Sequence, residues 1–169
     1  MNALKKIASI TIVGLLMVLF VYPLLHECGH SLLAIILGAD ILELELWPHP
    51  HVLCNMKNLS STSQVIVGAG GVLLPILFSA CVQQKRFWVW YCNMILIGIE
   101  TLSVVISLTA LISFGLGHPV ANEDMTTMLT IAPSARPVLF IITLVLLCGL
   151  IGLTIMKRPI TKLKTYLLN

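Results

Sequence analysis

The stretch HECGH, residues 26–30, places two histidines and a glutamate at a spacing that suits metal chemistry. On a helix, residues four apart lie on one face, so His26 and His30 can both direct an imidazole nitrogen at a single ion. Glu27 stands beside this pair, within reach of a water on the ion. This is the pattern of a catalytic zinc site, in which the metal lowers the pKa of its bound water and the carboxylate takes the proton as hydroxide attacks a peptide carbonyl.

The motif lies inside a long apolar run, where polar side chains need a reason to be present. An acidic side chain alone costs about 3 kcal/mol in the middle of a membrane helix. Two buried histidines beside an unrelated glutamate would leave that cost without compensation. We therefore expect one Zn²⁺ ion at His26 and His30, with Glu27 as the catalytic general base.

A catalytic zinc also needs a third protein ligand and an open fourth position. The segment NEDM offers Glu123 and Asp124 at the expected start of a helix. Glu100 is an alternative in the middle of another apolar run, and the segment WPHPHV offers His49 and His51. Acidic residues in a first helical turn are also common because they interact well with the helix dipole. The residue types alone leave the third ligand open.

The composition indicates that these residues lie in a membrane. The chain has 169 residues, of which 58% are hydrophobic and 10% are charged, whereas a soluble domain carries about 25% charged residues. Four apolar runs reach the roughly 18 residues that mark a candidate membrane-spanning helix. We expect an all-α polytopic membrane protein with about four transmembrane helices in one domain, residues 1–169. The expected spans are residues 7–39, 65–82, 87–117 and 137–156.

The first run is longer than a straight helix needs to cross the roughly 30 Å hydrocarbon core, so it must tilt, bend or protrude. Pro23 cannot donate a hydrogen bond to the carbonyl of Leu19 and is the expected place for a bend. Residues 41–46 then alternate between apolar and polar types. This alternation predicts a short β-strand or hairpin segment, which Pro48 and Pro50 end.

The basic residues predict an orientation. Eight of the ten lysines and arginines lie at the N-terminus, between the second and third runs, and at the C-terminus. The positive-inside rule then places both termini in the cytoplasm and residues 40–64 and 118–136 outside. His26 and Asp124 are expected on that same outer side. Because the cations are explained as flanks of membrane spans, we expect no nucleic-acid partner.

HECGH in a membrane helix, a Gly-rich second span and an aspartate that opens a later helix resemble the site-2 protease family of intramembrane zinc metalloproteases. The resemblance extends from about residue 16 to about residue 156. It implies that Asp124, which follows Asn122, is the third zinc ligand. It also implies that the strand after the metal helix is an edge on which an unwound substrate pairs. The family's Gly-Pro and later Asn correspond to the segment AGGVLL, with Gly71 and Leu74 in place of the proline and the asparagine.

Motif and resemblance together predict a zinc metalloendopeptidase that hydrolyses a peptide bond of a membrane-embedded or membrane-adjacent protein. Its partners are then the lipid bilayer and a membrane protein or peptide substrate, and the small size also permits a homo-oligomer. The alternative is a non-proteolytic metal-binding membrane protein, either an inactive relative that acts as a scaffold or chaperone, or a transporter. A transporter would need more polar residues in its spans than Asn93 and Glu100 provide. An inactive relative would normally have lost part of HECGH.

Overall fold

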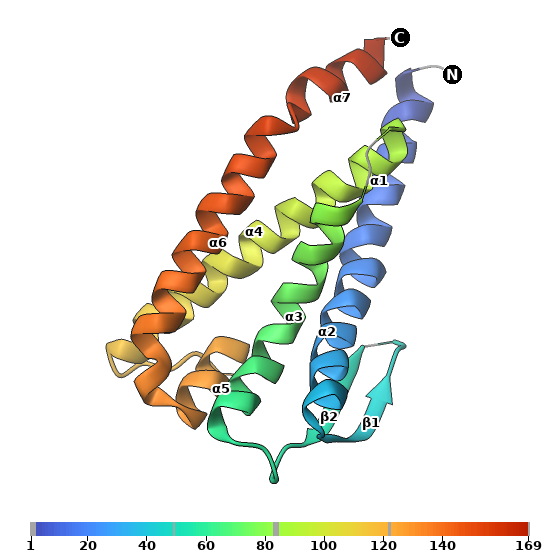
Figure 1. Cartoon of the computed structure of the whole chain (residues 1–169). Helices are drawn as coiled ribbons and strands as arrows, with labels where there is room; N and C mark the ends of the chain where they lie inside the picture. The colour runs from blue at the N-terminus through green and yellow to red at the C-terminus, as the bar shows by residue number, and fades with distance from the viewer. Residues whose placement is uncertain (1–2, 49, 83–84, 122, 169) are drawn as a thin grey trace.

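Long apolar helices dominate the computed structural model, which describes residues 3–48, 50–82, 85–121 and 123–168. Within these residues, four helical segments are long and apolar enough to cross a membrane, and they overlap the four expected spans. The fold is mostly helical, with a two-stranded antiparallel hairpin after the first span, as predicted (Figure 1). The segments are Ala3–Leu37, Ser61–Cys81, Phe87–Gly115 and Pro133–Leu168.

The first span is continuous but irregular. Helix α1 (Ala3–Leu16) passes through a π-helical turn (Met17–Val21) into helix α2 (Tyr22–Leu37), which carries Pro23 in its first turn. Because a proline has no N–H, the helix widens at this point instead of keeping its regular hydrogen bonds. The irregularity expected near Pro23 is therefore present, as a π-helical turn directly before it. Helix α2 ends at Gly38, whose φ of 86° is a left-handed conformation that glycine adopts without strain.

The hairpin follows directly. Strand β1 (Asp40–Glu45) pairs with strand β2 (His51–Asn55), from Asp40 opposite Asn55 to Glu45 opposite His51. Strand β1 begins and ends one residue earlier than the alternation of residues 41–46 predicts. Strand β2 follows the prolines, and its residue Val52 donates a backbone hydrogen bond to Glu27 of α2. The hairpin therefore brings backbone groups to HECGH.

The other elements complete the bundle. Helix α3 (Ser61–Cys81) begins after Ser60, whose side chain accepts a hydrogen bond from the backbone N–H of Ser63. Helix α4 (Phe87–Gly115) is followed by the short helix α5 (Asp124–Ile131), which lies outside the four spans. A 3₁₀ turn leads into helix α6 (Arg136–Met156), and helix α7 (Pro159–Leu168) ends the described chain. The expected fourth span, residues 137–156, ends where α6 ends, and α7 was not predicted from the sequence.

The two ends of the bundle differ in content. Both termini lie at one end, and the hairpin and α5 lie together at the other (Figure 1). This arrangement agrees with an even number of spans, because each crossing reverses the chain. It also brings the loop after the first span and the loop before the fourth to a single end, as the charge pattern predicts. That the hairpin end faces the outside of the cell stays a prediction.

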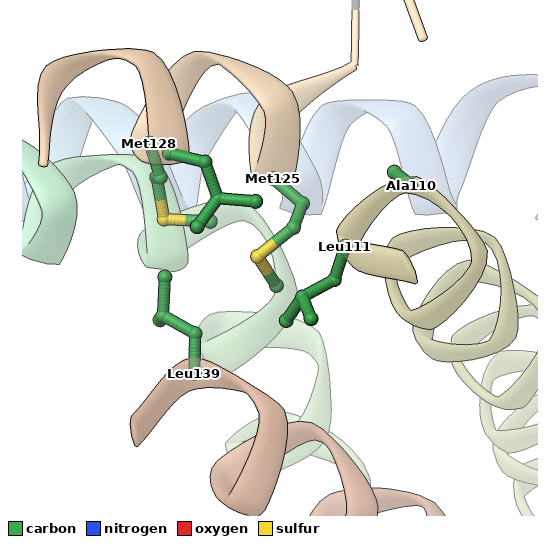
Figure 2. Close-up of a cluster of buried hydrophobic side chains, with 6 residues drawn as sticks. Ala110, Leu111, Met125, Met128 and Leu139 are labelled. Atoms are coloured by element: carbon green, nitrogen blue, oxygen red, sulfur yellow. The ribbon is translucent and has the colours of Figure 1, made fainter. Parts of the chain in front are cut away.

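Helix α5 is held in place by an apolar cluster. Its side chains Met125, Met128 and Leu129 are almost completely buried. Figure 2 shows Met125 and Met128 meeting side chains from α4 and α6. Burying a methionine or leucine side chain contributes about 2 kcal/mol, so this contact fixes the short helix firmly. Position and orientation of its first residue follow from that packing. The cluster members outside α5 are Ala110, Leu111 and Leu139.

Helices α2 and α3 cross at two glycines. A Cβ atom added at Gly29 would overlap the carbonyl oxygen of Gly70, and one added at Gly70 would overlap that of Gly29. Gly70 therefore allows α3 to pack closely against α2 at this crossing. The close approach also explains Gly29, which leaves room for a neighbouring backbone. The crossing brings α3 directly against the face of α2 that carries the motif.

We expect Gly29→Ala to destabilise the protein by about 2–3 kcal/mol, because the methyl group meets backbone that cannot move aside. The measurement is the free energy of unfolding in detergent. Gly98→Ala on α4 is the matched control, because a Cβ at Gly98 meets nothing within 4 Å. Equal stability of the two variants would contradict the close crossing.

Candidate metal centre

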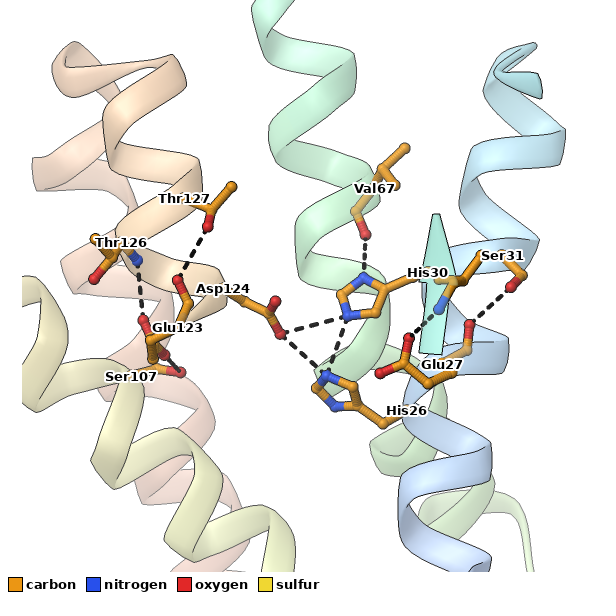
Figure 3. A network of polar contacts seen from close by, with 11 residues as sticks. His26, Glu27, His30, Ser31, Val67, Ser107, Glu123, Asp124, Thr126 and Thr127 are labelled. Atoms are coloured by element: carbon orange, nitrogen blue, oxygen red, sulfur yellow. Dashed lines mark hydrogen bonds and ion pairs between the residues drawn. The ribbon is translucent and has the colours of Figure 1, made fainter. Parts of the chain in front are cut away.

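The two motif histidines point towards one another and towards α5. The Nε2 atoms of His26 and His30 lie 3.1 Å apart. The carboxylate oxygen Oδ2 of Asp124 lies 3.0 Å from Nε2 of His26 and 3.4 Å from Nε2 of His30. Figure 3 shows Asp124 reaching from the start of α5 across to both rings. Three side chains from distant parts of the chain therefore present their donor atoms to one point.

These distances suit a tetrahedral ion. Two ligands bound at about 2.0–2.1 Å in tetrahedral geometry lie about 3.3 Å apart, and the three distances here are 3.0, 3.1 and 3.4 Å. The donor set, two imidazoles and one carboxylate, is the kind that leaves a fourth position open in catalytic zinc sites. The residues present therefore fit one zinc ion.

The backbone of α3 sets the protonation of one ring. Nδ1 of His30 lies 2.9 Å from the carbonyl oxygen of Val67. A carbonyl only accepts, so Nδ1 carries the hydrogen, and Nε2 of the neutral ring keeps its lone pair for a metal. Such a partner fixes the orientation of a ligating histidine. His26 differs, because its buried Nδ1 has no partner among the described residues.

Asp124 is ionised in this environment. Burial alone would raise the pKa of its carboxyl group, but the hydrogen bonds and charges of His26 and His30 outweigh burial and hold the pKa well below its usual range. A metal ligand of this type must be deprotonated. The site is more open on the side of Asp124, whose side chain is 43% exposed, than on the side of His26 and His30, whose side chains are 19% and 12% exposed.

Glu27 faces the same space from the other direction. Its Oε2 accepts a hydrogen bond of 3.1 Å from the backbone N–H of Val52 on β2. Glu27, His30 and Asp124 supply ionisable groups to a cavity of about 360 Å³, whose wall also includes apolar residues such as Val67 and Met128. We call it the polar cavity because of these ionisable groups. The hairpin thus fixes the carboxylate beside the histidine–aspartate group without occupying the space between them. Sequence reasoning missed this partner, because a backbone amide carries no residue-type signal.

Gly71 lies against both imidazoles. A Cβ atom added there would lie 2.5 Å from Cε1 of His26 and 2.5 Å from Nε2 of His30. Any side chain at this position would push the two donor atoms apart. The residue that stands where the resemblance expects a proline is thus one that leaves room for the imidazoles of His26 and His30.

Glu123 has a structural role beside His26, His30 and Asp124, which we call the triad. It is the N-cap residue of α5, and its Oε2 accepts a hydrogen bond of 2.9 Å from the backbone N–H of Thr126. Its other oxygen, Oε1, accepts one of 3.0 Å from the hydroxyl of Ser107 on α4. Both oxygens are therefore engaged away from the histidines, as Figure 3 shows. Glu123 and Ser107 together tie the start of α5 to α4 and so orient Asp124.

We expect Ser107→Ala to weaken zinc binding about tenfold, since residues that orient ligands typically affect metal affinity by 10- to 100-fold. Zinc affinity is measured by competition with a chelator of known affinity. Thr109→Ala is the control, because the Thr109 hydroxyl is exposed and bonds only to its own helix at Val105. An unchanged affinity in Ser107→Ala would show that the capping residue does not position Asp124.

The other candidate ligands lie elsewhere. Glu100 is fully buried, and it is not among the described groups whose donor atoms meet. Neither carboxylate oxygen of Glu100 has a hydrogen-bond partner among the described residues. Its neighbours along the buried face of α4, Ile97 and Val104, are apolar. Asn93 does join two helices, donating to the carbonyl oxygen of Ser79 on α3.

His51 of the segment WPHPHV does not join the triad of His26, His30 and Asp124 either. His51 lies 3.6 Å from both Glu43 and Glu45 on the exposed face of the hairpin. The three donor atoms are close enough for an ion, but exposed pairs of opposite charge form such groups without one. His49 lies outside the described residues. So does Asn122, which the resemblance places before the aspartate.

Comparison with models of known protein families, with curated proteins and with solved structures gave no match.

Proposed function

We propose that this chain is an intramembrane zinc metallopeptidase that hydrolyses a peptide bond of a membrane-embedded or membrane-adjacent polypeptide. The observation that carries the proposal is the meeting of His26, His30 and Asp124 at zinc-binding distances, with Glu27 lining the same cavity. In the proposal, those three residues hold the ion and Glu27 is the general base. A zinc ion in such a site supplies an activated water and polarises the carbonyl to be attacked.

The chain's own groups can bring a peptide to this point. The polar cavity is bounded by α2, by α5 and by strand β2, so an extended segment between β2 and α5 would pass Glu27 and Asp124. In the hairpin, β2 pairs with β1 along one edge only. Its backbone N–H at Val52 points to Glu27 rather than to β1. Apart from this N–H, the edge of β2 that faces the cavity pairs with no other strand among the described residues, so in the proposal it pairs with a substrate backbone, a common mode of peptide recognition.

The membrane setting selects the substrate class. The site lies at the hairpin end of four helices long and apolar enough to cross a bilayer (Figure 1). A segment that reaches it from the bilayer must first unwind, because a helical peptide bond is shielded by its own hydrogen bonds. We therefore propose a membrane protein or peptide as the substrate, with both of the enzyme's termini on the cytoplasmic side. The resemblance to site-2 proteases supports the same reading.

The proposal is tested with the full-length protein in lipid nanodiscs, freed of metal by a chelator and then reloaded with zinc. Detergent-solubilised membrane proteins are added, and new N-termini are identified by mass spectrometry. We expect a defined set of new termini with zinc and none without it. Stoichiometric zinc binding without any new termini would contradict the proposal and favour a metal-binding membrane protein without proteolysis.

A further inference from the structure

A second cavity adjoins the metal centre on its membrane side. It has a volume of about 290 Å³ and lies among α3, α4, α5 and α6. Its wall is almost wholly apolar and includes Val72, Val104 and Leu146, and its polar members near the site are Ser107 and Asp124. An apolar protein cavity of about 150 Å³ is known to hold a molecule of benzene. This one therefore has room for the largest apolar side chains.

The apolar cavity and the polar cavity share one boundary. Gly68, Asp124 and Met128 line both of them. A Cβ atom added at Gly68 would lie 2.7 Å from Cγ of Met128, so the methionine packs directly onto the glycine backbone. Methionine is the most adaptable of the apolar side chains. Asp124 thus lies at the boundary between the two cavities, with the polar cavity on the side of Glu27 and the apolar cavity on the side of the lipid.

We infer that the apolar cavity is the specificity pocket for a bulky apolar side chain of the substrate, next to the bond that is cleaved. This inference rests on the proposed function and names its side-chain preference. A peptide backbone bound at Asp124 can place one side chain in the apolar cavity, while its carbonyl group stays in the polar cavity. Leucine, methionine or phenylalanine gains from leaving water there, and alanine leaves the space unfilled. Membrane segments are rich in such residues.

The pocket wall also fits a side chain that arrives from the bilayer. Ile66 and Leu73 of α3 and Ile142 of α6 line the cavity and are also exposed on the outside of the bundle. The cavity therefore reaches the lipid-facing surface between α3 and α6. A lipid acyl chain has the same apolar chemistry, and the experiment must separate it from a substrate side chain. The two are distinguished by attachment to the metal. The affinity of a zinc-bound compound depends on its side chain if that side chain occupies the cavity, whereas a lipid in the cavity has no such connection to the ion.

The test uses two hydroxamates, zinc-binding probes that differ only in carrying a benzyl or a methyl side chain. Their affinities for the zinc-loaded, full-length protein in detergent are measured by calorimetry. We expect the benzyl compound to bind at least about tenfold more tightly, since apolar pockets discriminate by about that factor for each methylene. Val72→Phe fills the pocket and should reduce this preference to about twofold or less. Leu77→Phe is the matched control on the same helix, because Leu77 is 60% exposed and does not line the cavity.

Ile142→Phe narrows the pocket from α6 and serves where Val72→Phe does not fold. Equal affinities of the two probes in the unsubstituted protein would overturn the pocket while leaving the proposed function standing. A preference that survives both pocket variants would overturn it too. Release of a co-purified lipid by Val72→Phe, without any probe preference, would identify a lipid site instead. Failure of the zinc-treated protein to bind either probe would refute the metal centre, and the proposed function with it.

Discussion

Glu27→Gln should reduce peptide cleavage by about 100- to 10,000-fold, the range that a general base contributes, while the protein still binds one zinc ion. The amide oxygen of a glutamine can accept the same hydrogen bond from the backbone of Val52 that Oε2 of Glu27 accepts now. The hairpin and the triad should therefore keep their places. What is lost is the capacity to take a proton from water. The measurement is the rate at which new N-termini appear, together with the zinc content of the same sample.

Asp40→Asn is the matched control for this change. Asp40 is another carboxylate residue, at the start of the hairpin, but it does not line the polar cavity. Its variant should cleave at the rate of the unsubstituted protein. Undiminished cleavage by Glu27→Gln would show that Glu27 is not the general base. Loss of zinc in that variant would show that Glu27 acts as a ligand instead.

The second large effect is expected at the metal itself. Asp124→Ala should lower zinc affinity by more than 100-fold, which exceeds the loss typical for residues that only orient ligands. Removing the carboxylate leaves two imidazoles and takes away the only carboxylate donor that meets them among the described residues. The fold should survive, because α5 is held by Met125, Met128 and Leu129 rather than by the aspartate. Chelator competition measures the affinity, and circular dichroism checks the helix content.

Two neighbouring candidates make this experiment selective. Glu100→Gln should leave zinc affinity unchanged, since Glu100 lies apart from the three donor atoms. Glu123→Ala should show an intermediate loss of about tenfold, because it removes a cap and the tie to Ser107 but no ligand. A larger loss in Glu100→Gln or Glu123→Ala than in Asp124→Ala would reassign the third ligand.

The part of the site that lies within one helix was readable from the sequence. His26 and His30 are four residues apart, and the period of a helix is enough to place both rings on one face. The four spans could also be predicted, since a run of about 18 or more apolar residues is typical of a membrane-spanning helix. The strand after the first span also followed from its alternation, to within one residue at each end.

The residue types alone did not separate Glu123 from Asp124, and only the resemblance to site-2 proteases favoured Asp124. Both are acids at a helix start, and the geometry separates them. The N-cap residue turns its side chain back onto the N–H groups of its own helix, so Glu123 is engaged at Thr126. The next residue, Asp124, points outward to the histidines. That assignment requires the position of α5 relative to α2, which depends on packing between segments far apart in the chain.

Backbone partners were missed for a more general reason. The carbonyl of Val67 orients His30, and the N–H of Val52 holds Glu27. Every residue except proline offers such groups, so no residue type signals them. Small residues do carry a signal, since glycines in membrane helices are typical of close helix contacts. Which glycine meets Gly29 and which meets the imidazoles depends on the crossing of α2 and α3.

The most direct test of the account is a crystal structure of the zinc-loaded protein with anomalous data collected at the zinc edge. The account predicts one strong anomalous peak per chain, about 2.0–2.2 Å from Nε2 of His26, Nε2 of His30 and a carboxylate oxygen of Asp124. The carboxylate of Glu27 should lie near the open fourth position without binding the ion. A peak at the exposed group of Glu43, Glu45 and His51, with none between the two motif histidines, would contradict it.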